Sequence, residues 1–340
     1  MNDPEARIRE LLALSKSLTY IDPTTSIAHA IAASELAKSG CEPRLHIAVL
    51  HQYMCMLFGL GQIHEGCHVL FSALVIAETH NFELERGDLL HHLGVAHYTL
   101  GEYITAIDYW SDCLNLGNAQ FSAATRIHAH IGVGQIYYAC GQFSDALRHH
   151  QAAERWLTDE TDAELRARLL INIAADLYEL ADYEAAQSIL HQAEQITLEL
   201  NHREYLGEIY SYKTLIAMLT NQFAAAHQFI EQGQRLVRVW AWGEISWYIV
   251  KGRILFSEGK FTDSLSEFTR ALEMATQMGC GHKVFIIHQF LAQVFNTLGQ
   301  TKASEYHHKL YQEHFHRLLD PNLFQRLAQL ESEIQRLSKV

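Results

Sequence analysis

The sequence predicts an all-α fold, a right-handed superhelical solenoid of about eight helical hairpins followed by one more helix. Three observations lead to this fold class. Only 4 of the 340 residues are proline, which favours long helices over a loop-rich all-β fold. Short turn sequences recur at intervals of 40, 40, 40, 40, 38 and 40 residues. The residues that flank these turns keep the same phase from one repeat to the next.

The centre of each turn marks the point where one helix ends and the next begins. The turns read LGQI, LGEY, CGQF, LADY, TNQF, EGKF and LGQT, and their central residues are Gly61, Gly101, Gly141, Ala181, Asn221, Gly259 and Gly299. Gly or Asn at such a point supplies the positive φ that terminates a helix. We therefore expect each repeat to be a helical hairpin that turns at one of these residues.

Small and aromatic residues occupy fixed places around each turn. Five residues after the centre stand Gly66, Ala106, Ala146, Ala186, Ala226, Ser264 and Ser304, all of them small. Two residues after the centre, the side chain is mostly aromatic, as at Tyr103 and Phe143. Small residues let two helices approach closely, and the aromatic side chain fills the wedge between them. The pattern therefore predicts tightly packed hairpins.

Two repeats show the full pattern most clearly. They read GVAHYTLGEYITA (Gly94 to Ala106) and GQIYYACGQFSDA (Gly134 to Ala146). The shared pattern G-x-x-[YH]-x-x-x-G-x-[YF]-x-x-A resembles the tetratricopeptide (TPR) repeat. The usual TPR period is about 34 residues, so the repeats of this chain are a stretched form. The resemblance covers roughly residues 40–315.

The repeats divide the chain into three expected segments. Residues 1–40, around IDPTTSIAHA with Pro23 at the turn, are expected to form a degenerate hairpin that caps the array. Residues 41–318 are expected to form the TPR-like array, in which Thr214 at a usually small position suggests a looser fifth repeat. Residues 319–340 are expected to form a C-terminal amphipathic helix.

Composition and charge exclude several functional classes. Lys and Arg number 26 against 39 Asp and Glu, so the formal net charge is −13. A field of this sign repels phosphate backbones and anionic membranes, so we expect no nucleic-acid and no membrane partner. The polar start MNDPEARIREL is no signal peptide, and no apolar run is long enough to span a membrane. Together with six scattered cysteines and no C-x-x-C pair, this predicts a cytoplasmic protein.

Motifs for catalysis or metal binding are few. HEGCH (His64 to His68) matches H-E-x-x-H, in which two histidines bind zinc beside a general-base glutamate. The repeat explains this segment better, because Gly66 occupies the small position and no third ligand follows at a motif spacing. Phosphate-binding, dinucleotide-binding and nucleophile-elbow motifs are absent from the sequence. We therefore expect no metal, no cofactor and no enzymatic activity.

The TPR resemblance implies a concave groove, lined by the first helix of each hairpin, that binds a protein, a peptide or a small ligand. Three residues before the turn centres stand the aromatic candidates Phe58, Tyr98, Tyr138, Tyr178 and Phe256. They form either an amphipathic platform for the ligand or the packing between adjacent first helices. Both interpretations stay open.

Polar residues in neighbouring groove columns vary between repeats. The polar candidates are His91, His128, Gln135, Arg168 and Arg253. In an acidic protein, an inward-facing arginine offers a bidentate site for a carboxylate or a phosphate. The alternative is an ion pair of these arginines with Glu179, Glu208 or Glu244.

A tryptophan-rich segment, VWAWGEISWYIV (Val239 to Val250), coincides with the one interval of 38 residues. It contains Trp240, Trp242 and Trp247. Such a shortened connection is either well packed or part of a ligand pocket, and packing is the favoured interpretation.

The last segment has a hydrophobic seam at spacings of four, three, four and three residues. It consists of Leu323, Leu327, Leu330, Ile334 and Leu337. Such a seam has the a/d spacing of a coiled coil of about two heptads. One interpretation is a capping helix that folds back on the last repeat. The other is a coiled coil that forms a homodimer and passes a signal onward.

Stretched TPRs followed by such a helix are similar to the front half of bacterial signalling proteins. In those, the repeats precede a GGDEF diguanylate cyclase, a histidine kinase or a transcription-activating domain. The resemblance implies a regulatory, sensory domain whose output module lies beyond Val340 or in a partner.

Two rival functions have other requirements. A stand-alone scaffold or chaperone-type adaptor of the carboxylate-clamp kind needs basic groove residues where this chain has His51, Asp88, His91 and His128. A TPR receptor for peptide pheromones needs an N-terminal effector domain, for which roughly 40 residues are too few.

Overall fold

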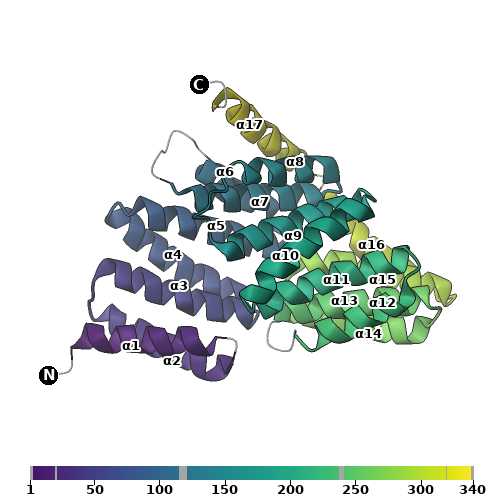
Figure 1. Cartoon of the computed structure of the whole chain (residues 1–340), viewed down its shortest axis with the longest axis horizontal. Coiled ribbons are helices and arrows are strands. Elements are labelled where there is room, and N and C mark those ends of the chain that lie inside the picture. Colours follow the sequence, from purple (N-terminus) through teal and green to yellow (C-terminus); the bar gives the residue numbers. More distant parts are fainter. Residues whose placement is uncertain (1–2, 20, 115–120, 237–240, 319, 338–340) are drawn as a thin grey trace.

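The computed structural model of the chain describes residues 3–19, 21–114, 121–236, 241–318 and 320–337. All regular secondary structure within these ranges is α-helical. The helices are α1 (Pro4–Leu18), α2 (Pro23–Lys38), α3 (Pro43–Gly59), α4 (Ile63–Thr79), α5 (Glu83–Leu100), α6 (Tyr103–Leu114), α7 (Ala123–Ala139), α8 (Phe143–Glu154), α9 (Ala163–Glu179), α10 (Tyr183–Glu199), α11 (Arg203–Leu219), α12 (Phe223–Gln234), α13 (Ala241–Ser257), α14 (Phe261–Gln277), α15 (Gly281–Thr297), α16 (Thr301–Leu318) and α17 (Pro321–Leu337). Consecutive helices pair as hairpins, and the hairpins stack into a solenoid (Figure 1).

The backbone confirms the predicted turns. All seven predicted turn centres have positive φ, from 58° at Asn221 to 82° at Gly101. Even Ala181 adopts this conformation, with φ of 61°. A second set of positive-φ residues, including Asn81 and Asn201, joins one hairpin to the next. The chain therefore changes direction about every 20 residues, as helices of about 17 residues joined by short turns require.

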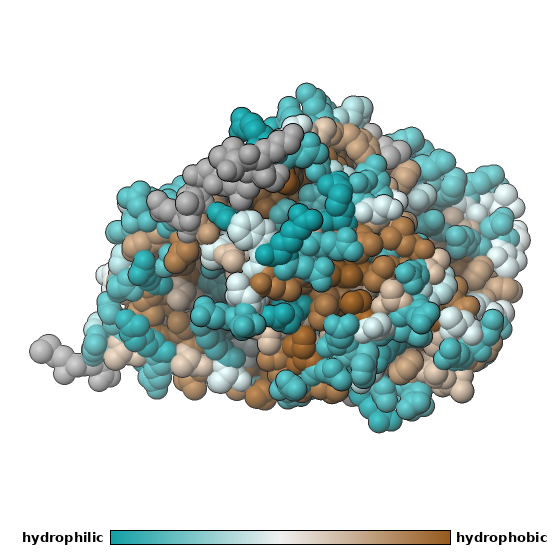
Figure 2. Space-filling view, turned by 45° about the horizontal axis from the view of Figure 1, so that its top comes forward, coloured by the Kyte–Doolittle hydropathy of each residue, from teal (hydrophilic) through white to brown (hydrophobic). Residues whose placement is uncertain are grey.

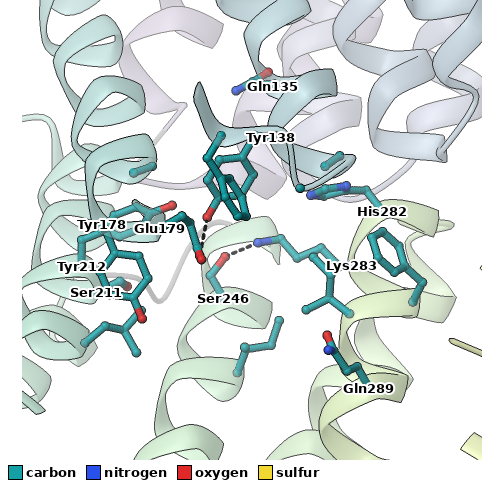
Figure 3. A pocket seen from close by; sticks show the side chains of 18 of the residues that line it. Gln135, Tyr138, Tyr178, Glu179, Ser211, Tyr212, Ser246, His282, Lys283 and Gln289 are labelled. Carbon is teal, nitrogen blue, oxygen red and sulfur yellow. Dashed lines mark hydrogen bonds between the residues drawn. The ribbon is translucent and has the colours of Figure 1, made fainter. Parts of the chain in front are cut away.

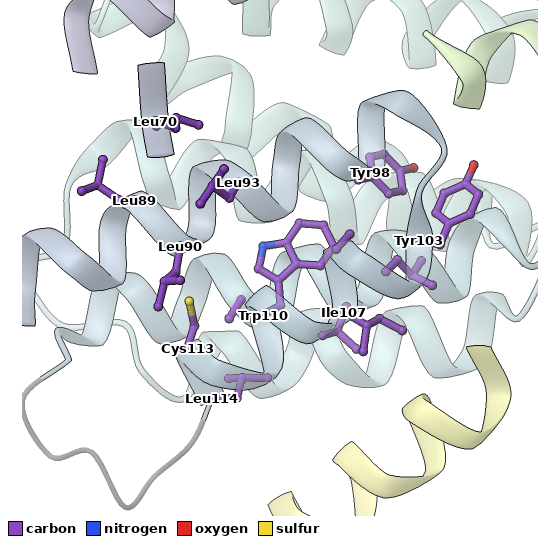
Figure 4. Packing of buried hydrophobic residues seen from close by; sticks show 14 of the residues in the cluster. Leu70, Leu89, Leu90, Leu93, Tyr98, Tyr103, Ile107, Trp110, Cys113 and Leu114 are labelled. Atoms are coloured by element: carbon purple, nitrogen blue, oxygen red, sulfur yellow. The ribbon is translucent and has the colours of Figure 1, made fainter. Parts of the chain in front are cut away.

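The small residues of the repeat allow close helix crossings, as the sequence predicts. Ala146 and Ala186 are fully buried. Gly94 and Gly132 have no room for a Cβ because both lie against the indole of Trp110, which is itself fully buried. Figure 4 shows this indole among Leu90, Leu93 and Ile107 of the same hydrophobic cluster. Small residues therefore allow a close crossing within a hairpin, at Gly94, and between successive hairpins, at Gly132.

The N-terminal hairpin α1–α2 continues the solenoid. Ile8, Leu11 and Ala33 are buried with Val49 of α3 in a small hydrophobic cluster. Both helices begin with a proline after an aspartate whose side chain accepts a hydrogen bond from the first turn. The start of the chain is therefore held on the array by apolar burial.

The two halves of the array meet and close the superhelix. The turn between α5 and α6 lies against the start of α15, where His282 contacts the hydroxyls of Tyr98 and Tyr103 at 3.1 Å each. Gly281 has no room for a Cβ because the Leu100 carbonyl occupies that space. One hydrophobic cluster accordingly combines residues of α4 and α5 with residues of α13, α14 and α15. The inner surface of the solenoid thereby surrounds an interior that is partly open to solvent.

The C-terminal helix α17 packs against α6 of the same chain (Figure 1). Leu323, Leu327 and Leu330 are at most 3% exposed, and Ile334 packs against the cluster that contains them. The side chain of Leu337 lies outside the described residues. The hydrophobic seam of α17, which could have paired with a second chain, therefore packs against helices of the same chain. It also does not form a cap on the last repeat alone, because its leucines share one cluster with residues of α3 to α7.

A polar contact holds α17 at its middle. Glu331 accepts hydrogen bonds from Arg148 at 3.0 Å, from His149 at 2.6 Å and from the Tyr137 hydroxyl at 3.2 Å. Burial alone would raise the pKa of Glu331, but the hydrogen bonds from His149 and Arg148 outweigh it and lower the pKa to about 2. The carboxylate is therefore ionised and held between α7 and α8.

Hydrophilic residues cover most of the face shown in Figure 2, and hydrophobic residues gather toward its middle. In the described part of the chain, no helix combines the length and apolar character that crossing a membrane requires.

Candidate functional site

Three adjoining cavities lie inside the closed superhelix. Cavity A, bordered by Tyr138, Tyr178 and Lys283, has a volume of about 580 Å³. Cavity B, bordered by Phe58, has about 390 Å³, and cavity C, bordered by His128, has about 550 Å³. Cavities A and B share Tyr98, Gln135, Glu208, Tyr212 and Trp242, whereas B and C share His92, Arg168 and Tyr205. Neighbouring cavities of the interior therefore adjoin through shared wall residues.

The groove candidates from the sequence lie mostly along this space. All of them except Phe256 border a cavity: Phe58, His91, Tyr98, His128, Gln135, Tyr138, Arg168, Tyr178 and Arg253. The first helices of the hairpins carry them, as the resemblance implied. Phe256 instead lies 5.3 Å from the ring of Phe261 in a hydrophobic cluster.

The aromatic column serves both purposes that the sequence left open. In each of four repeats the candidate ring contacts the aromatic ring just after the turn, as for Tyr98 with Tyr103 and Tyr138 with Phe143. The three tyrosines of this column also border cavity A. Packing thus holds each tyrosine in one orientation and leaves part of it facing the interior.

Acidic and basic side chains both line cavity A, among them Glu179 and Lys283 (Figure 3). Glu179 accepts a hydrogen bond from the Tyr138 hydroxyl at 3.0 Å. Arg253 donates to the Tyr178 hydroxyl at 2.9 Å, and Lys283 donates to Ser246 Oγ at 2.6 Å. Arg253 and Lys283 form no ion pair with a carboxylate among the described residues. The ion pair that the sequence offered for Arg253 is therefore not formed, and the arginine remains available to an anion.

Two carboxylates on α11 face the interior without a hydrogen-bond partner among the described residues. They are Glu204 and Glu208, one helical turn apart. Burial raises the pKa of Glu208. Burial and the nearby Glu208 and Glu164 carboxylates raise the pKa of Glu204 to about 7, although His202 opposes this. A ligand that brings a hydrogen-bond donor or a cation into the cavity would stabilise the ionised form of these carboxylates.

Cavity C is lined by neutral histidines. His91 and His128 stack with ring centroids 4.1 Å apart, and His128 Nδ1 lies 3.2 Å from an Arg168 guanidinium nitrogen. Because an arginine only donates, His128 Nδ1 must accept this bond. Burial lowers the pKa of both histidines well below the usual value, and the nearby positive groups add to this. Arg168, like Arg253, thus has a neutral partner.

The sequence missed several residues that border cavity A or B. Glu204, Trp242 and His282 all stand 17 residues before a turn centre, at the start of a first helix. A column at that spacing would have found them. Trp247 is buried against Gly233, which fits the favoured packing interpretation, whereas Trp242 packs against a hydrophobic cluster and also borders both cavities. Trp240 lies outside the described residues.

The structure places the HEGCH segment at the start of α4. Gly66 lies against the ring of Phe58, which leaves no space for a Cβ. Within the ranges described above, no group of three or more His, Cys, Asp or Glu side chains is arranged to hold a metal ion.

Comparison with known proteins gives one local sequence relative. No protein-family model matches the chain. The regulatory protein RapG of Bacillus subtilis (strain 168) is 35% identical over 81 residues. This match covers 24% of the chain and 22% of RapG, so it spans about a fifth of that protein's length.

Several solved structures resemble the chain over most of its length. A Rap protein complexed with competence and sporulation factor aligns with a TM-score of 0.61 and 13% identity, covering 94% of this chain and 99% of that one. The apo form of the quorum sensor NprR from B. thuringiensis has a TM-score of 0.52 at 16% identity, with coverages of 92% and 89%. The Rap conjugation gene regulator of plasmid pLS20, in complex with the Phr* peptide, has 0.51 at 14%, with coverages of 97% and 96%. At these identities the likeness shows the fold, a TPR-like solenoid.

Proposed function

We propose that this protein is a non-catalytic regulator that binds a short peptide inside its closed superhelix. The observation that carries the proposal is cavity A, whose volume of about 580 Å³ lies in the range of ligand-binding pockets. Two solved structures of the same fold are complexes, one with competence and sporulation factor and one with the Phr* peptide. The likeness to the Rap chain covers 99% of that chain, so the short segment before the repeats is no argument against a peptide receptor.

The chemistry of the walls suits a peptide. Amide side chains of Gln135 and Asn172, joined by a hydrogen bond of 3.2 Å, offer further donors and acceptors to a peptide backbone. Tyr138, Tyr178 and Tyr212 supply flat apolar area with a polar edge. A ligand of alternating amide groups and side chains would use both kinds of surface.

Blocking the cavity tests this proposal. Ser211 of α11 borders cavity A, and Ser211→Trp would place an indole in it. We expect the wild-type protein to retain peptides from a synthetic random library of short peptides through size-exclusion chromatography, with mass spectrometry as the readout. Ser211→Trp should retain at least tenfold less, whereas Gln187→Trp on the exposed side of α10 should bind like the wild type. Failure of the wild-type protein to retain any peptide would contradict the proposal.

A relay through the C-terminal helix is the finer part of the proposal. Tyr311 and Phe315 of α16 border cavity A and also pack against the cluster that contains Leu323 and Leu327 of α17. A ligand that shifts α16 would therefore alter the packing under α17. The receiver would be a cyclase, kinase or transcription-activating module beyond Val340, or a separate protein.

A further inference from the structure

Lys283 is enclosed without a counter-ion in direct contact. Its ammonium donates one hydrogen bond, to Ser246 Oγ, and lies 4.2 Å from the centroid of the Trp242 ring. An ammonium has three N–H donors, so two remain for a ligand. Burial lowers the pKa of Lys283, and the fields of Cys280 and Glu208 only partly oppose this. Enclosing a cation among neutral partners costs stability, which a bound anion would offset.

The wall around Lys283 is built to hold the side chain in place. Ser246 on α13 and Trp242 one turn earlier both contact it, and all three residues border cavity A, where Figure 3 shows Ser246 and Lys283. Paired lysines elsewhere in the chain differ. Lys251 forms an ion pair of 2.6 Å with Glu267, and Lys213 pairs with Glu194. Lys283 therefore differs from Lys213 and Lys251 because it forms no ion pair with a carboxylate of the described residues.

Resting on the proposed function, we propose that Lys283 binds a carboxylate of the peptide ligand within cavity A. A carboxylate accepts charge-assisted hydrogen bonds from the free N–H groups of the ammonium. The Ser246 hydroxyl accepts from Lys283 and donates its own hydrogen to the Trp242 carbonyl at 3.1 Å, so it orients the ammonium and leaves the carboxylate to the lysine.

The carboxylate has two possible sources in a peptide, the C-terminus or an acidic side chain, and the experiment separates them. Two random libraries of short peptides would be compared, one with free C-termini and one with amidated C-termini. Each is passed with wild-type protein, Lys283→Gln or Lys251→Gln through size-exclusion chromatography, and retained peptides are quantified by mass spectrometry. Lys251→Gln is the matched control, because its ion pair with Glu267 lies outside the cavity lining.

We expect Lys283→Gln to retain at least tenfold less peptide than the wild type and than Lys251→Gln. Loss of retention with the amidated library assigns the carboxylate to the C-terminus. Retention of amidated peptides enriched in Asp or Glu, and lost in Lys283→Gln, assigns it to a side chain and equally supports the inference. Undiminished retention by Lys283→Gln overturns the inference and leaves the proposed function standing. Retention of no peptide by wild-type protein overturns both.

Thermal unfolding of the unliganded variants distinguishes a ligand-binding role of Lys283 from a structural one. Since Lys283 has no carboxylate in contact, Lys283→Gln should melt at or above the wild-type temperature. A fall of several degrees would show that the lysine supports the fold, and would overturn the assignment as a ligand-binding residue.

Discussion

His282 Nε2 lies 3.1 Å from the hydroxyl of Tyr98, a residue 184 positions earlier in the chain. The other ring nitrogen, Nδ1, lies 3.1 Å from the Tyr103 hydroxyl. Burial lowers the pKa of His282 to about 3, so the ring is neutral and has one donor and one acceptor. It therefore accepts from one tyrosine and donates to the other. This pair of contacts joins the two halves of the superhelix at the edge of cavity A.

Replacing this histidine should loosen the closure. His282→Phe keeps a ring of similar size but leaves two buried hydroxyls without a partner, at a cost of about 1–3 kcal/mol each. We expect a lower melting temperature and a larger radius of gyration in small-angle scattering. His191→Phe, at an exposed histidine on α10, is the control and should change neither quantity. An unchanged radius and melting temperature for His282→Phe would show that the apolar contacts alone close the ring.

Gly94 and Gly59 should respond oppositely to alanine. An added Cβ at Gly94 overlaps the buried Trp110 indole, so Gly94→Ala should destabilise the protein by about 1–3 kcal/mol. Gly59, the last residue of α3, has open space at that position, so Gly59→Ala should stabilise by at most about 0.5 kcal/mol, less than in the middle of a helix. Urea denaturation measures both. If both substitutions changed the free energy of unfolding in the same direction, Gly94 would not be required for the close helix crossing.

Leu327→Asp should release α17 without changing the number of chains in the assembly. The leucine is 2% exposed against earlier helices, and its burial contributes about 1.5–3 kcal/mol. We expect faster tryptic cleavage near Arg326 and an unchanged mass in light scattering. Gln329→Asp adds the same charge on the exposed side of α17 and should behave like the wild type. A wild-type dimer that Leu327→Asp converts to a monomer would restore the interpretation of the seam as a coiled coil.

Glu204 should make stability depend on pH between about 4.5 and 7. Its pKa is raised from 4.5 to about 7, so the folded protein holds this proton more tightly than the unfolded chain. The stabilisation is complete below pH 4.5 and is lost as the pH rises through 7. Glu204→Gln should therefore raise the melting temperature at pH 8 relative to the wild type and leave it nearly unchanged at pH 4.5. Equal shifts at both pH values would show that the carboxylate titrates normally.

The candidate site was partly predictable because repeats place equivalent residues on the same face. The columns that contain Tyr98, Tyr138 and Arg168 border the interior as expected. Lys283 and Glu204 were not predicted, because they stand at the starts of first helices, 16 and 17 residues before a turn centre. The partner of Arg253 could not be read from spacing either, because the Tyr178 hydroxyl is 75 residues away in the chain.

The sequence by itself determined the hairpins, their turns and their packing register. Gly101, Ala181 and Asn221 act through their own backbone conformation, and Gly94 acts through Trp110 of the same hairpin, so these features are local. Only the tertiary structure decided that the ring closes at His282 and that α17 docks on α6. Those contacts depend on the rotation that accumulates over several stacked hairpins, since small differences at each interface add up to decide which repeats meet. A periodic sequence shows which residues face inward, but the summed geometry of all repeats determines which of them touch.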